Sequence, residues 1–357
     1  MNVLHVIDDE KFINSCKATF AVDGIDNYYL NKNKVSDVYI IDNSIHIVVF
    51  HYLSLEDAYF ISKCTLNIKY IWFFWGADGF CFGEYYNKFL LSKTKRIRIL
   101  NEFTTSVFSG IKCFTKTLFP FIIDKSKTIH IMSSAIKKID VVVPVMPLDF
   151  EMLKSDYGFE NRLIHVNYLT PFFFDNEEEE MPRFSNGRSI LLGNSASYTN
   201  NHIEAIDVLK ACNSTREIII PLNYGDKSYA SRVSNYAKSR LGEKVRVLSD
   251  FLDFKEYIAV MDSTSIIVMN HCRQQAVGNI IMGLLTGKTL YLRKETTVFN
   301  FLFSEGFYIK EFGENMEELE VFDSIKLLEN YHNAYRVFGR ERIHKKIEYL
   351  LKEVVSE

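Results

Sequence analysis

The sequence contains only six cysteines and six prolines among 357 residues. No two cysteines have the Cys-x-x-Cys spacing of a zinc ribbon, and their scatter does not suit a disulfide scaffold, so a reducing compartment is expected. The formal net charge is −3, so the sequence does not have the excess of basic residues that is typical of nucleic-acid-binding proteins. These absences point away from zinc modules, disulfide-stapled proteins and partners made of nucleic acid.

Long apolar runs are missing as well. No window contains eighteen uninterrupted apolar residues, so a membrane-spanning helix is not expected. The N-terminal apolar run is short and the acidic Asp8 and Asp9 follow at once, which does not fit a signal peptide. Aromatic residues are frequent by contrast, at 14%. Ordinary core packing is the default explanation, and the alternative is that some of them face a membrane or an isoprenoid chain.

The first half of the chain alternates between short apolar strands and helical patterns. The run 70–75 is continuously apolar, which is typical of a strand covered on both faces of a sheet. This alternation predicts a parallel α/β sheet. Further strands are expected at 3–7, 45–50, 140–145 and 163–168, and helices at 11–20 and 57–63.

The composition changes at 174–187, where four consecutive glutamates precede a stretch rich in Pro, Ser, Asn and Gly. A solvated linker is the default interpretation of such a segment. We therefore expect an N-terminal Rossmann-like domain at 1–175, an acidic linker at 176–188, a C-terminal Rossmann-like domain at 189–325, and a C-terminal helix within 326–357 that could pack back on the N-terminal domain.

The second half repeats the strand–helix alternation more clearly and predicts a doubly wound domain. Such sheets bind ligands outside the carboxyl ends of their strands, at a switch point. Two Rossmann-like domains facing a cleft would be the GT-B arrangement of nucleotide-sugar transferases, an analogy at the level of fold. Strands are expected at 189–192, 217–221, 245–248, 266–269 and 289–292, and helices at 202–212, 229–241, 254–261, 276–285 and 340–355.

A polar turn, Asn270–Asn279, leaves one of these strands and opens a helix. A helix start offers unpaired N–H groups and the positive end of a dipole, and the Arg273 guanidinium can grip a phosphate through two hydrogen bonds. The turn is therefore a candidate anion site. The alternative is that Arg273 has no ligand and forms only an ion pair at the surface. Parallel topology brings the other strand ends to the same edge, and they contribute Gly193, Asn194, Ser195, Asn200, His202 and Tyr224 beside Gln274, Gln275, Gly278 and Asn279.

These residues resemble a known family, the 4-acetamido-4,6-dideoxygalactose transferases of enterobacterial common antigen synthesis (TDP-Fuc4NAc:lipid II transferases, glycosyltransferase family 56). The resemblance keeps the order and spacing of its segments over roughly residues 70–300. One departure is Ala276, where the family tends to have glycine, which hints at an altered donor fit. The matching segments are Phe74-Trp75-Gly76-Ala77-Asp78, Leu192-Gly193-Asn194-Ser195, Asn200, His202-Ile203, Ala205, Pro221, Tyr224-Gly225, Tyr229 and Arg273-Gln274-Gln275 through Gly278.

The resemblance implies a glycosyltransferase that moves a Fuc4NAc-like sugar from a dTDP-sugar to a saccharide on undecaprenyl diphosphate. It implies a peripheral protein on the cytoplasmic face of the bacterial inner membrane, acting in O-antigen or common antigen synthesis, with no cofactor beyond the donor. Because the sequence has no Asp-x-Asp motif, Arg273 and helix N–H groups would neutralise the departing diphosphate without a metal. The alternatives are a UDP- or GDP-sugar donor, or a non-catalytic nucleotide-sugar-binding subunit.

The first domain supplies the candidate acceptor site. Asp78 follows the strand 70–75 in a Gly-Ala-Asp-Gly turn, where we expect its carboxylate to be exposed at the sheet edge as a general base or an acceptor ligand. The alternative is a structural carboxylate that caps the next helix. Glu84 is the reserve base, and Asp8, Asp9 and Trp75 complete the predicted acceptor-binding set.

Two other enzyme classes fit poorly. Ser195 lacks the Gly-x-Ser-x-Gly elbow of a hydrolase, and Gly193 does not open the Gly-x-Gly-x-x-Gly fingerprint of a nicotinamide dehydrogenase.

The stretch 85–121 interleaves lysines and arginines with apolar residues. It predicts either a basic surface that contacts anionic lipid or a pair of core helices with a solvated basic face.

Overall fold

The computed structural model describes residues 1–8, 10–80, 85–105, 127–157, 161–166, 178, 181–182 and 184–355. The chain forms two compact units. Unit 1 comprises Met1–Tyr85, Ile123–Asn176 and Arg336–Glu357, and unit 2 comprises Tyr86–Ile122 and Glu177–Tyr335. Both units are discontinuous in sequence: the segment Tyr86–Ile122, from within the expected N-terminal domain, groups with unit 2, and Arg336–Glu357 groups with unit 1.

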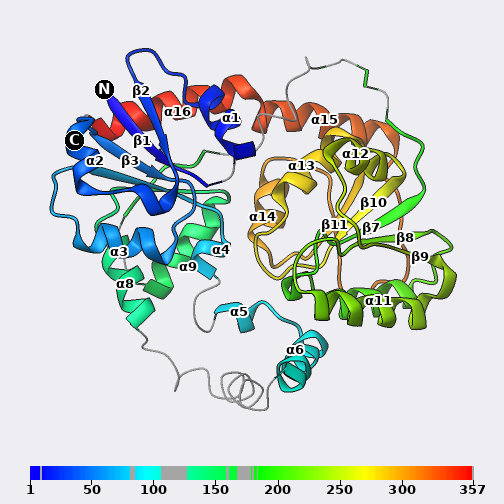
Figure 1. Cartoon of the computed structure of the whole chain (residues 1–357). Coiled ribbons are helices and arrows are strands. Elements are labelled where there is room, and N and C mark those ends of the chain that lie inside the picture. The colour runs from blue at the N-terminus through cyan, green and yellow to red at the C-terminus, as the bar shows by residue number, and fades with distance from the viewer. Residues whose placement is uncertain are drawn as a thin grey trace. The chain divides into compact units, whose positions relative to one another are not determined.

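Unit 1 contains a six-stranded parallel sheet in the order β2-β1-β3-β4-β5-β6, with helices on both faces (Figure 1). The direction of strand order reverses between β1 and β3, which makes this pair the switch point of the sheet. The strands are β1 (Asn2–Val6), β2 (Asp26–Leu30), β3 (Ile47–Phe50), β4 (Lys69–Phe74), β5 (Val141–Pro144) and β6 (Arg162–Leu163).

The helices of unit 1 cover the apolar strands that the sequence indicates. One face of the sheet packs against α1 and α16. Phe20, which directly follows α1, and Ile347 of α16 form a single core with Val49 and Phe73 of the strands. Helix α16 therefore belongs to unit 1 although it ends the chain. The helices are α1 (Glu10–Thr19), α2 (Asp37–Asp42), α3 (Leu55–Lys63), α4 (Ala77–Phe80), α8 (Lys127–Ile136), α9 (Pro147–Tyr157) and α16 (Arg340–Val355), with a 3-10 turn at Lys32–Lys34.

Unit 2 has a second six-stranded parallel sheet, in the order β12-β11-β10-β7-β8-β9. This is the Rossmann strand order, and its switch point lies between β7 and β10. The strands are β7 (Ser189–Leu192), β8 (Ile218–Pro221), β9 (Val245–Leu248), β10 (Thr264–Met269), β11 (Thr289–Leu292) and β12 (Lys310–Glu311).

Helices also cover both faces of the unit 2 sheet (Figure 1). On one face, Ile206 of α10 and Val233 of α11 form a core with the strands, and Leu90 joins this core from the first half of the sequence. The helices are α6 (Ser92–Thr105), α10 (His202–Ala211), α11 (Lys227–Leu241), α12 (Phe254–Asp262), α13 (Val277–Leu285), α14 (Thr297–Ser304) and α15 (Ser324–Phe338). The short α5 (Tyr85–Lys88) and 3-10 turns at Tyr198–Asn200 and Gly242–Lys244 complete the described elements.

A buried carboxylate explains why α6 groups with unit 2. Glu204 of α10 accepts hydrogen bonds from the main-chain N–H groups of Lys93 and Thr94, at 2.7 and 2.9 Å, and from the Thr94 hydroxyl at 2.6 Å. Glu204 thus caps the N-terminus of α6 from another element, where a negative charge also meets the positive end of the helix dipole. A cap supplied by a residue 110 positions away cannot be found from local sequence patterns.

Candidate functional site

The carboxyl ends of β7 and β10 meet at the switch point of unit 2, and Gly193 occupies the first of these ends. Its φ of +71° lies in the left-handed region that glycine adopts at low cost. A Cβ at this position would lie 2.7 Å from both Asn200 Oδ1 and His202 Nε2. Glycine is therefore required here because the backbone passes directly against two polar side chains.

Asn200 joins the two strand ends. Its Oδ1 accepts hydrogen bonds from the Asn194 main-chain N–H at 3.0 Å and from His271 Nε2 at 2.9 Å, while its Nδ2 donates to Ser195 Oγ at 3.3 Å. Because the amide oxygen accepts, His271 carries its proton on Nε2. Burial, followed by the nearby Arg273 charge, lowers the pKa of His271 well below its ordinary value. The imidazole is therefore neutral at neutral pH.

A second chain of hydrogen bonds runs across three strand ends. Thr199 Oγ1 donates to Gln275 Oε1 at 2.6 Å, and Gln275 Nε2 donates to Asn194 Oδ1 at 3.2 Å. Asn194 Nδ2 then donates to the Tyr224 hydroxyl at 2.9 Å. One hydrogen-bond network thus fixes four of the predicted donor residues, Asn194, Asn200, Tyr224 and Gln275. All of its hydrogen-bonding groups are uncharged.

Helix α13 begins at this edge. The positive end of its dipole and the charge of Arg273 make the edge electropositive. Ala276, the residue before the helix, has φ +57° and ψ +30°, and its own side chain makes no capping hydrogen bond. The Arg273 Nη1 donates to the Gln274 carbonyl at 2.7 Å, and the side chain lines a small cavity with His271 and Gln275. A guanidinium beside a helix start forms an anion-binding arrangement.

The remaining predicted donor residues lie less directly at the edge. Gln274 is buried, Gly278 is in the first turn of α13, and Asn279 donates to the Tyr257 hydroxyl at 2.9 Å. For His202 the sequence allowed either a contact with a donor phosphate or a place in the first turn of a helix. It is the first residue of α10, is fully buried and contacts the Tyr229 hydroxyl. Burial lowers the pKa of His202 to about 3, so its ring remains neutral.

Sequence reasoning missed two polar residues of this edge. Thr199 completes the cross-edge chain. Asn201 has a left-handed φ of +49°, donates to the Asn270 carbonyl at 3.3 Å and accepts from the Leu91 N–H at 2.8 Å. Asparagine tolerates this backbone conformation better than most residues. The Asn200-Asn201 pair directly before a helix was the available signal.

Unit 1 has a cavity of ≈ 180 Å³ at its own switch point. This is smaller than the roughly 300 Å³ at which sites for drug-sized ligands begin. Two predicted acceptor residues, Asp8 and Trp75, meet there at the ends of β1 and β4. The lining consists of Val6, Ile7, Asp8, Phe12, Lys32, His51, Tyr52, Asp57 and Trp75.

The charges of this cavity come from Asp8, Lys32 and Asp57. Asp8 pairs with Lys32 at 3.0 Å, and a hydrogen bond to Asp8 raises the pKa of Lys32. Asp57 is 2% exposed and accepts from the Ser54 main-chain N–H and hydroxyl through Oδ2, while its Oδ1 has no partner among the described residues. Burial raises the pKa of Asp57 to about 6. A carboxyl group with that pKa in a cavity is poised to exchange protons near neutral pH.

Tyr52, which also lines the cavity, has a φ of +143°, a conformation that is strained for a residue with a side chain. Strained residues are frequent at functional sites. Lys32, His51, Tyr52 and Asp57 were all missed from the sequence. Polar residues after the strand that ends at Phe50 were the signal for two of them, whereas β2, which precedes Lys32, was not recognised as a strand.

Asp78 requires a correction. The sequence predicted an exposed carboxylate, but Asp78 is fully buried and accepts three hydrogen bonds, from Leu53 N at 3.1 Å, Trp72 Nε1 at 2.8 Å and Trp75 N at 3.0 Å. Burial raises its pKa to about 6. With its oxygens engaged beneath the edge, Asp78 holds the ends of β3 and β4 in place. This role is structural, but it differs from the expected alternative of a cap on the next helix, because all three donors precede Asp78 in the chain. Glu84 and Asp9 lie outside the described residues.

Only part of the basic stretch 85–121 is described. In α6, Thr94, Ile97 and Asn101 face the core of unit 2, where Asn101 donates to the Tyr198 hydroxyl at 2.7 Å. On the opposite side Leu100 is 54% exposed and Phe103 is 36% exposed. The helix is therefore a core helix on one face and keeps apolar groups at the surface on the other. Among the described helices none is long and apolar enough to cross a bilayer.

Comparison with known proteins agrees with the predicted family. Residues 164–334 match the family model described as 4-alpha-L-fucosyltransferase glycosyl transferase group 56. This range includes the whole donor-edge set and confirms the family resemblance for that part of the sequence. The segment Phe74–Asp78, which contributed to the resemblance, lies outside the matched range.

Solved structures show the same fold over nearly the whole chain. A glycosyltransferase from Rickettsia africae is 13% identical with a TM-score of 0.61, covering 99% of this chain and 98% of its own. The HepE protein of Anabaena, in complex with UDP and glucose, is 10% identical with a TM-score of 0.62 and coverages of 99% and 100%. A sucrose-phosphate synthase from Thermosynechococcus elongatus is 9% identical with a TM-score of 0.61 and coverages of 99% and 98%. The predicted GT-B fold is confirmed.

Proposed function

We propose that this chain, a glycosyltransferase of group 56 with the GT-B fold, moves a 4-acetamido-4,6-dideoxyhexose from a dTDP-sugar to a saccharide on undecaprenyl diphosphate. The reaction would serve surface polysaccharide synthesis, either O-antigen or enterobacterial common antigen. The observation that carries the donor half of this proposal is the switch-point edge of unit 2, where a neutral hydrogen-bond network surrounds Arg273 and a helix start.

The donor edge suits a leaving diphosphate. Among the predicted donor residues Arg273 is a cation and none is acidic, so a diphosphate would meet a positive charge there. The first-turn N–H groups of α13 add donors that are already oriented, which stabilises charge as it develops on the leaving group. In support, the related Anabaena fold was solved with UDP and glucose bound. We propose that these groups act without a cofactor other than the sugar nucleotide.

The acceptor half rests on the cavity of unit 1. Trp75 offers an apolar ring to the C–H groups of a sugar, and Asp8 offers carboxylate oxygens to its hydroxyls. We assign the role of general base to Asp57 in place of Asp78, because Asp57 lines the cavity, keeps Oδ1 unpaired among the described residues and has a pKa near 6. Asp78 would position the strand ends around it.

The lipid-linked acceptor calls for contact with a membrane surface. Arg96, Leu100 and Phe103 follow the i, i+4, i+7 spacing of one helix face on α6, and the two apolar members are exposed. Apolar groups beside a cation bind anionic bilayers. We expect the chain to float with vesicles that contain phosphatidylglycerol and to lose this property in the Leu100→Ser, Phe103→Ser double variant. The matched control is Phe251→Ser, which removes a 75% exposed ring elsewhere in unit 2.

Donor choice is tested by thermal denaturation with dTDP, UDP and GDP, followed by calorimetric titration and by product analysis with the lipid-linked acceptor. A nucleotide that binds the folded state raises the melting temperature by mass action. We expect dTDP to do so and the other two not to. Protection by UDP or GDP alone would replace the donor assignment, and dTDP binding without sugar transfer would favour a non-catalytic binding subunit.

The role of Arg273 is tested with a matched pair of arginines in unit 2. Arg273→Ala should abolish measurable dTDP binding. Arg216→Ala removes an arginine just before β8, at the opposite edge of the sheet, where its guanidinium donates to the Arg188 carbonyl and to Ser265 Oγ. That variant should bind dTDP normally. Equal affinity in both variants would remove Arg273 from the donor site.

A further inference from the structure

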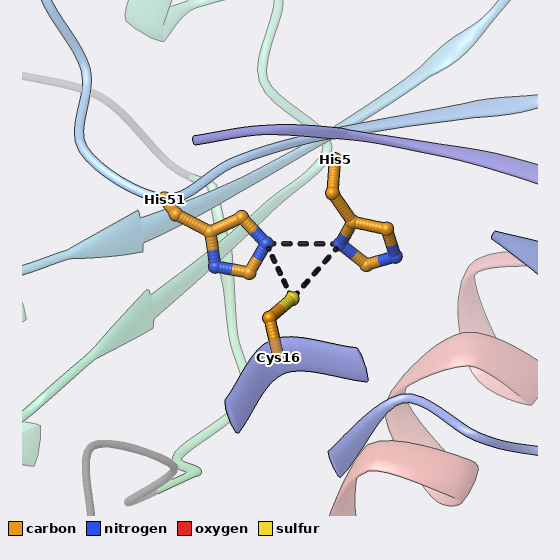
Figure 2. Close-up of side chains that lie close together, drawn as sticks. All are labelled: His5, Cys16 and His51. Carbon is orange, nitrogen blue, oxygen red and sulfur yellow. Dashed lines mark hydrogen bonds between the residues drawn. The ribbon is translucent and has the colours of Figure 1, made fainter. Parts of the chain in front are cut away.

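A buried group of three potential metal ligands lies beside the unit 1 cavity. His5 comes from β1, Cys16 from α1, and His51 directly follows β3, so the three side chains converge on the switch point of the sheet (Figure 2). All three are buried, with Cys16 and His5 fully enclosed and His51 4% exposed. The conventional alternative is a cluster of neutral side chains that only hydrogen-bond to one another.

The ligand atoms form a compact triangle. The distances are 2.9 Å between His5 Nδ1 and His51 Nε2, 3.6 Å between Cys16 Sγ and His5 Nδ1, and 3.4 Å between Cys16 Sγ and His51 Nε2. A point equidistant from the three atoms lies about 1.9 Å from each, and a cation slightly out of their plane reaches the roughly 2.0–2.3 Å of zinc–nitrogen and zinc–sulfur bonds. The triangle therefore accepts an ion with only small shifts.

The surroundings fix one ligand in the required form. Asn27 Nδ2 donates to the Phe20 carbonyl at 2.8 Å, which turns Asn27 Oδ1 toward His5 Nε2, also at 2.8 Å. Because that oxygen can only accept, the His5 proton resides on Nε2 and the lone pair of Nδ1 faces the centre of the triangle. An outer hydrogen bond that sets the tautomer in this way is a regular feature of histidine metal ligands.

Aromatic rings enclose the triangle. Tyr29 stacks on His5 with ring centroids 5.0 Å apart, Phe73 stacks on His51 at 5.2 Å, and the edge of Phe20 meets both histidines. A thiolate with two neutral imidazoles selects thiophilic ions of filled d shell over Mg²⁺ or Ca²⁺. The chemistry is shared by Zn²⁺ and Cu⁺, of which Cu⁺ with one thiolate would be uncharged and thus easier to bury.

We propose that His5, Cys16 and His51 bind one thiophilic cation, Zn²⁺ or Cu⁺, that ties β1, α1 and β3 together at the floor of the cavity. Binding exchanges the Cys16 thiol proton for the metal and releases one proton per ion. The His51 proton, which Nε2 shares with His5 Nδ1 in the absence of an ion, moves to His51 Nδ1 so that Nε2 can bind the cation. Since His51 also lines the cavity, the ion would hold one wall of that cavity in place. The proposal does not depend on which sugar the enzyme transfers.

The test measures metal binding by the full-length protein and needs no turnover assay. The chain is purified under reducing conditions, stripped with a chelator, and titrated separately with Zn²⁺ and with Cu⁺ against colorimetric competitors; Co²⁺ serves as an optical probe of thiolate ligation. We expect one equivalent of at least one of the two ions, a rise in melting temperature and a Co²⁺–thiolate charge-transfer band. No binding of either ion by the folded wild-type protein would overturn the proposal.

Variants separate this site from other ligands. Cys16→Ser should lose the charge-transfer band and weaken binding at least 100-fold. Cys212→Ser, which changes a cysteine of unit 2 that contacts the Met316 carbonyl, should retain both properties. Should Cys16→Ser fold poorly, Asn27→Leu provides a milder change, because it leaves all three ligands and removes the bond that fixes the His5 tautomer; a 10- to 100-fold loss is expected. Full binding by a folded Cys16→Ser protein would refute the site.

Discussion

The carboxyl edges of the two sheets occupy equivalent positions in their folds but are built from different groups. The unit 2 edge combines amides, hydroxyls and neutral imidazoles with two cations, Arg273 and Arg293, the second of which donates to Asn270 Oδ1 at 3.2 Å. The unit 1 edge surrounds its cavity with two carboxylates, a lysine and aromatic rings. One edge therefore suits an anion such as a nucleoside diphosphate, and the other suits a neutral, hydroxyl-bearing ligand.

The two edges also differ in which polar groups are held by hydrogen bonds. At the unit 2 edge, Asn200 and Gln275 each bond on both sides of the amide, so the donors are preorganised before a ligand arrives. At the unit 1 edge, Asp57 Oδ1 has no partner among the described residues. Preorganisation favours binding and charge stabilisation, whereas an unsatisfied buried carboxylate is a candidate for proton transfer.

The largest expected effect concerns the choice between Asp57 and Asp78. Both carboxyls are buried and have a pKa of about 6, but only Asp57 lines the cavity. A base works when deprotonated, so kcat/KM of the wild-type enzyme should rise with pH through about 6 and then level off. Asp57→Asn should lower kcat by roughly 10²- to 10⁴-fold and remove this rising limb.

Asp78→Asn is the matched control for this measurement, because it changes a carboxyl with the same burial and the same direction of pKa shift. It should keep the rising limb even where its stability falls. A pH profile that loses the limb in Asp78→Asn and keeps it in Asp57→Asn would reverse the two roles.

The second prediction concerns the stability that Asp78 gives to the acceptor edge. Asp78→Ala leaves the N–H groups of Leu53, Trp72 and Trp75 without their acceptor in a buried region. Each unsatisfied donor costs about 1–3 kcal/mol, so the free energy of unfolding should fall by at least about 3 kcal/mol in denaturant titrations. Asp140→Ala, which removes the acceptor of one N–H, that of Tyr70, and a partly exposed ion pair with Lys69, should cost only about 1–2 kcal/mol. Equal losses would show that the three bonds act weakly.

The third prediction tests preorganisation at the donor edge. Gln275→Leu removes the acceptor of Thr199 and the donor to Asn194, and so cuts the chain that joins β7 to β10. Calorimetry should show dTDP affinity reduced roughly 10- to 100-fold, the equivalent of about 1–3 kcal/mol. Asn300→Leu, an exposed change on α14 where the amide bonds only to nearby main chain, should leave affinity unchanged. Unaltered affinity in Gln275→Leu would mean that the donor bypasses this chain.

The sequence predicts the donor edge better than the acceptor edge, for a physical reason. The predicted donor residues follow recognisable strands at 189–192 and 266–269, and parallel topology alone places Asn194 and Arg273 at the same sheet edge. At the acceptor edge, β2 is a half-buried edge strand of polar and aromatic residues, so Lys32 had no strand to mark it.

Burial is the other quantity that local patterns do not determine. Asp78 follows an apolar strand in a polar turn, as an exposed catalytic carboxylate would, and only the packed structure shows that Trp72 Nε1 reaches back to it. Glu204 likewise reads as an ordinary residue of the first helical turn, yet it caps α6 from a distance of 110 residues. The trio of His5, Cys16 and His51 is equally scattered in sequence and meets only in the folded sheet.

The smallest expected effect concerns Ala276 at the start of α13. Its φ of +57° costs an alanine about 1 kcal/mol or more, a strain that glycine does not have. Glycine also loses about 0.4–1 kcal/mol through the greater freedom of the unfolded chain, so Ala276→Gly should range from neutral to about 1 kcal/mol stabilising in denaturant titrations. Ala259→Gly, at an exposed position within α12, should instead cost about 1 kcal/mol. If both variants lost the same stability, Ala276 would not hold its left-handed conformation in solution, and the departure from glycine at this helix start would have no conformational cost.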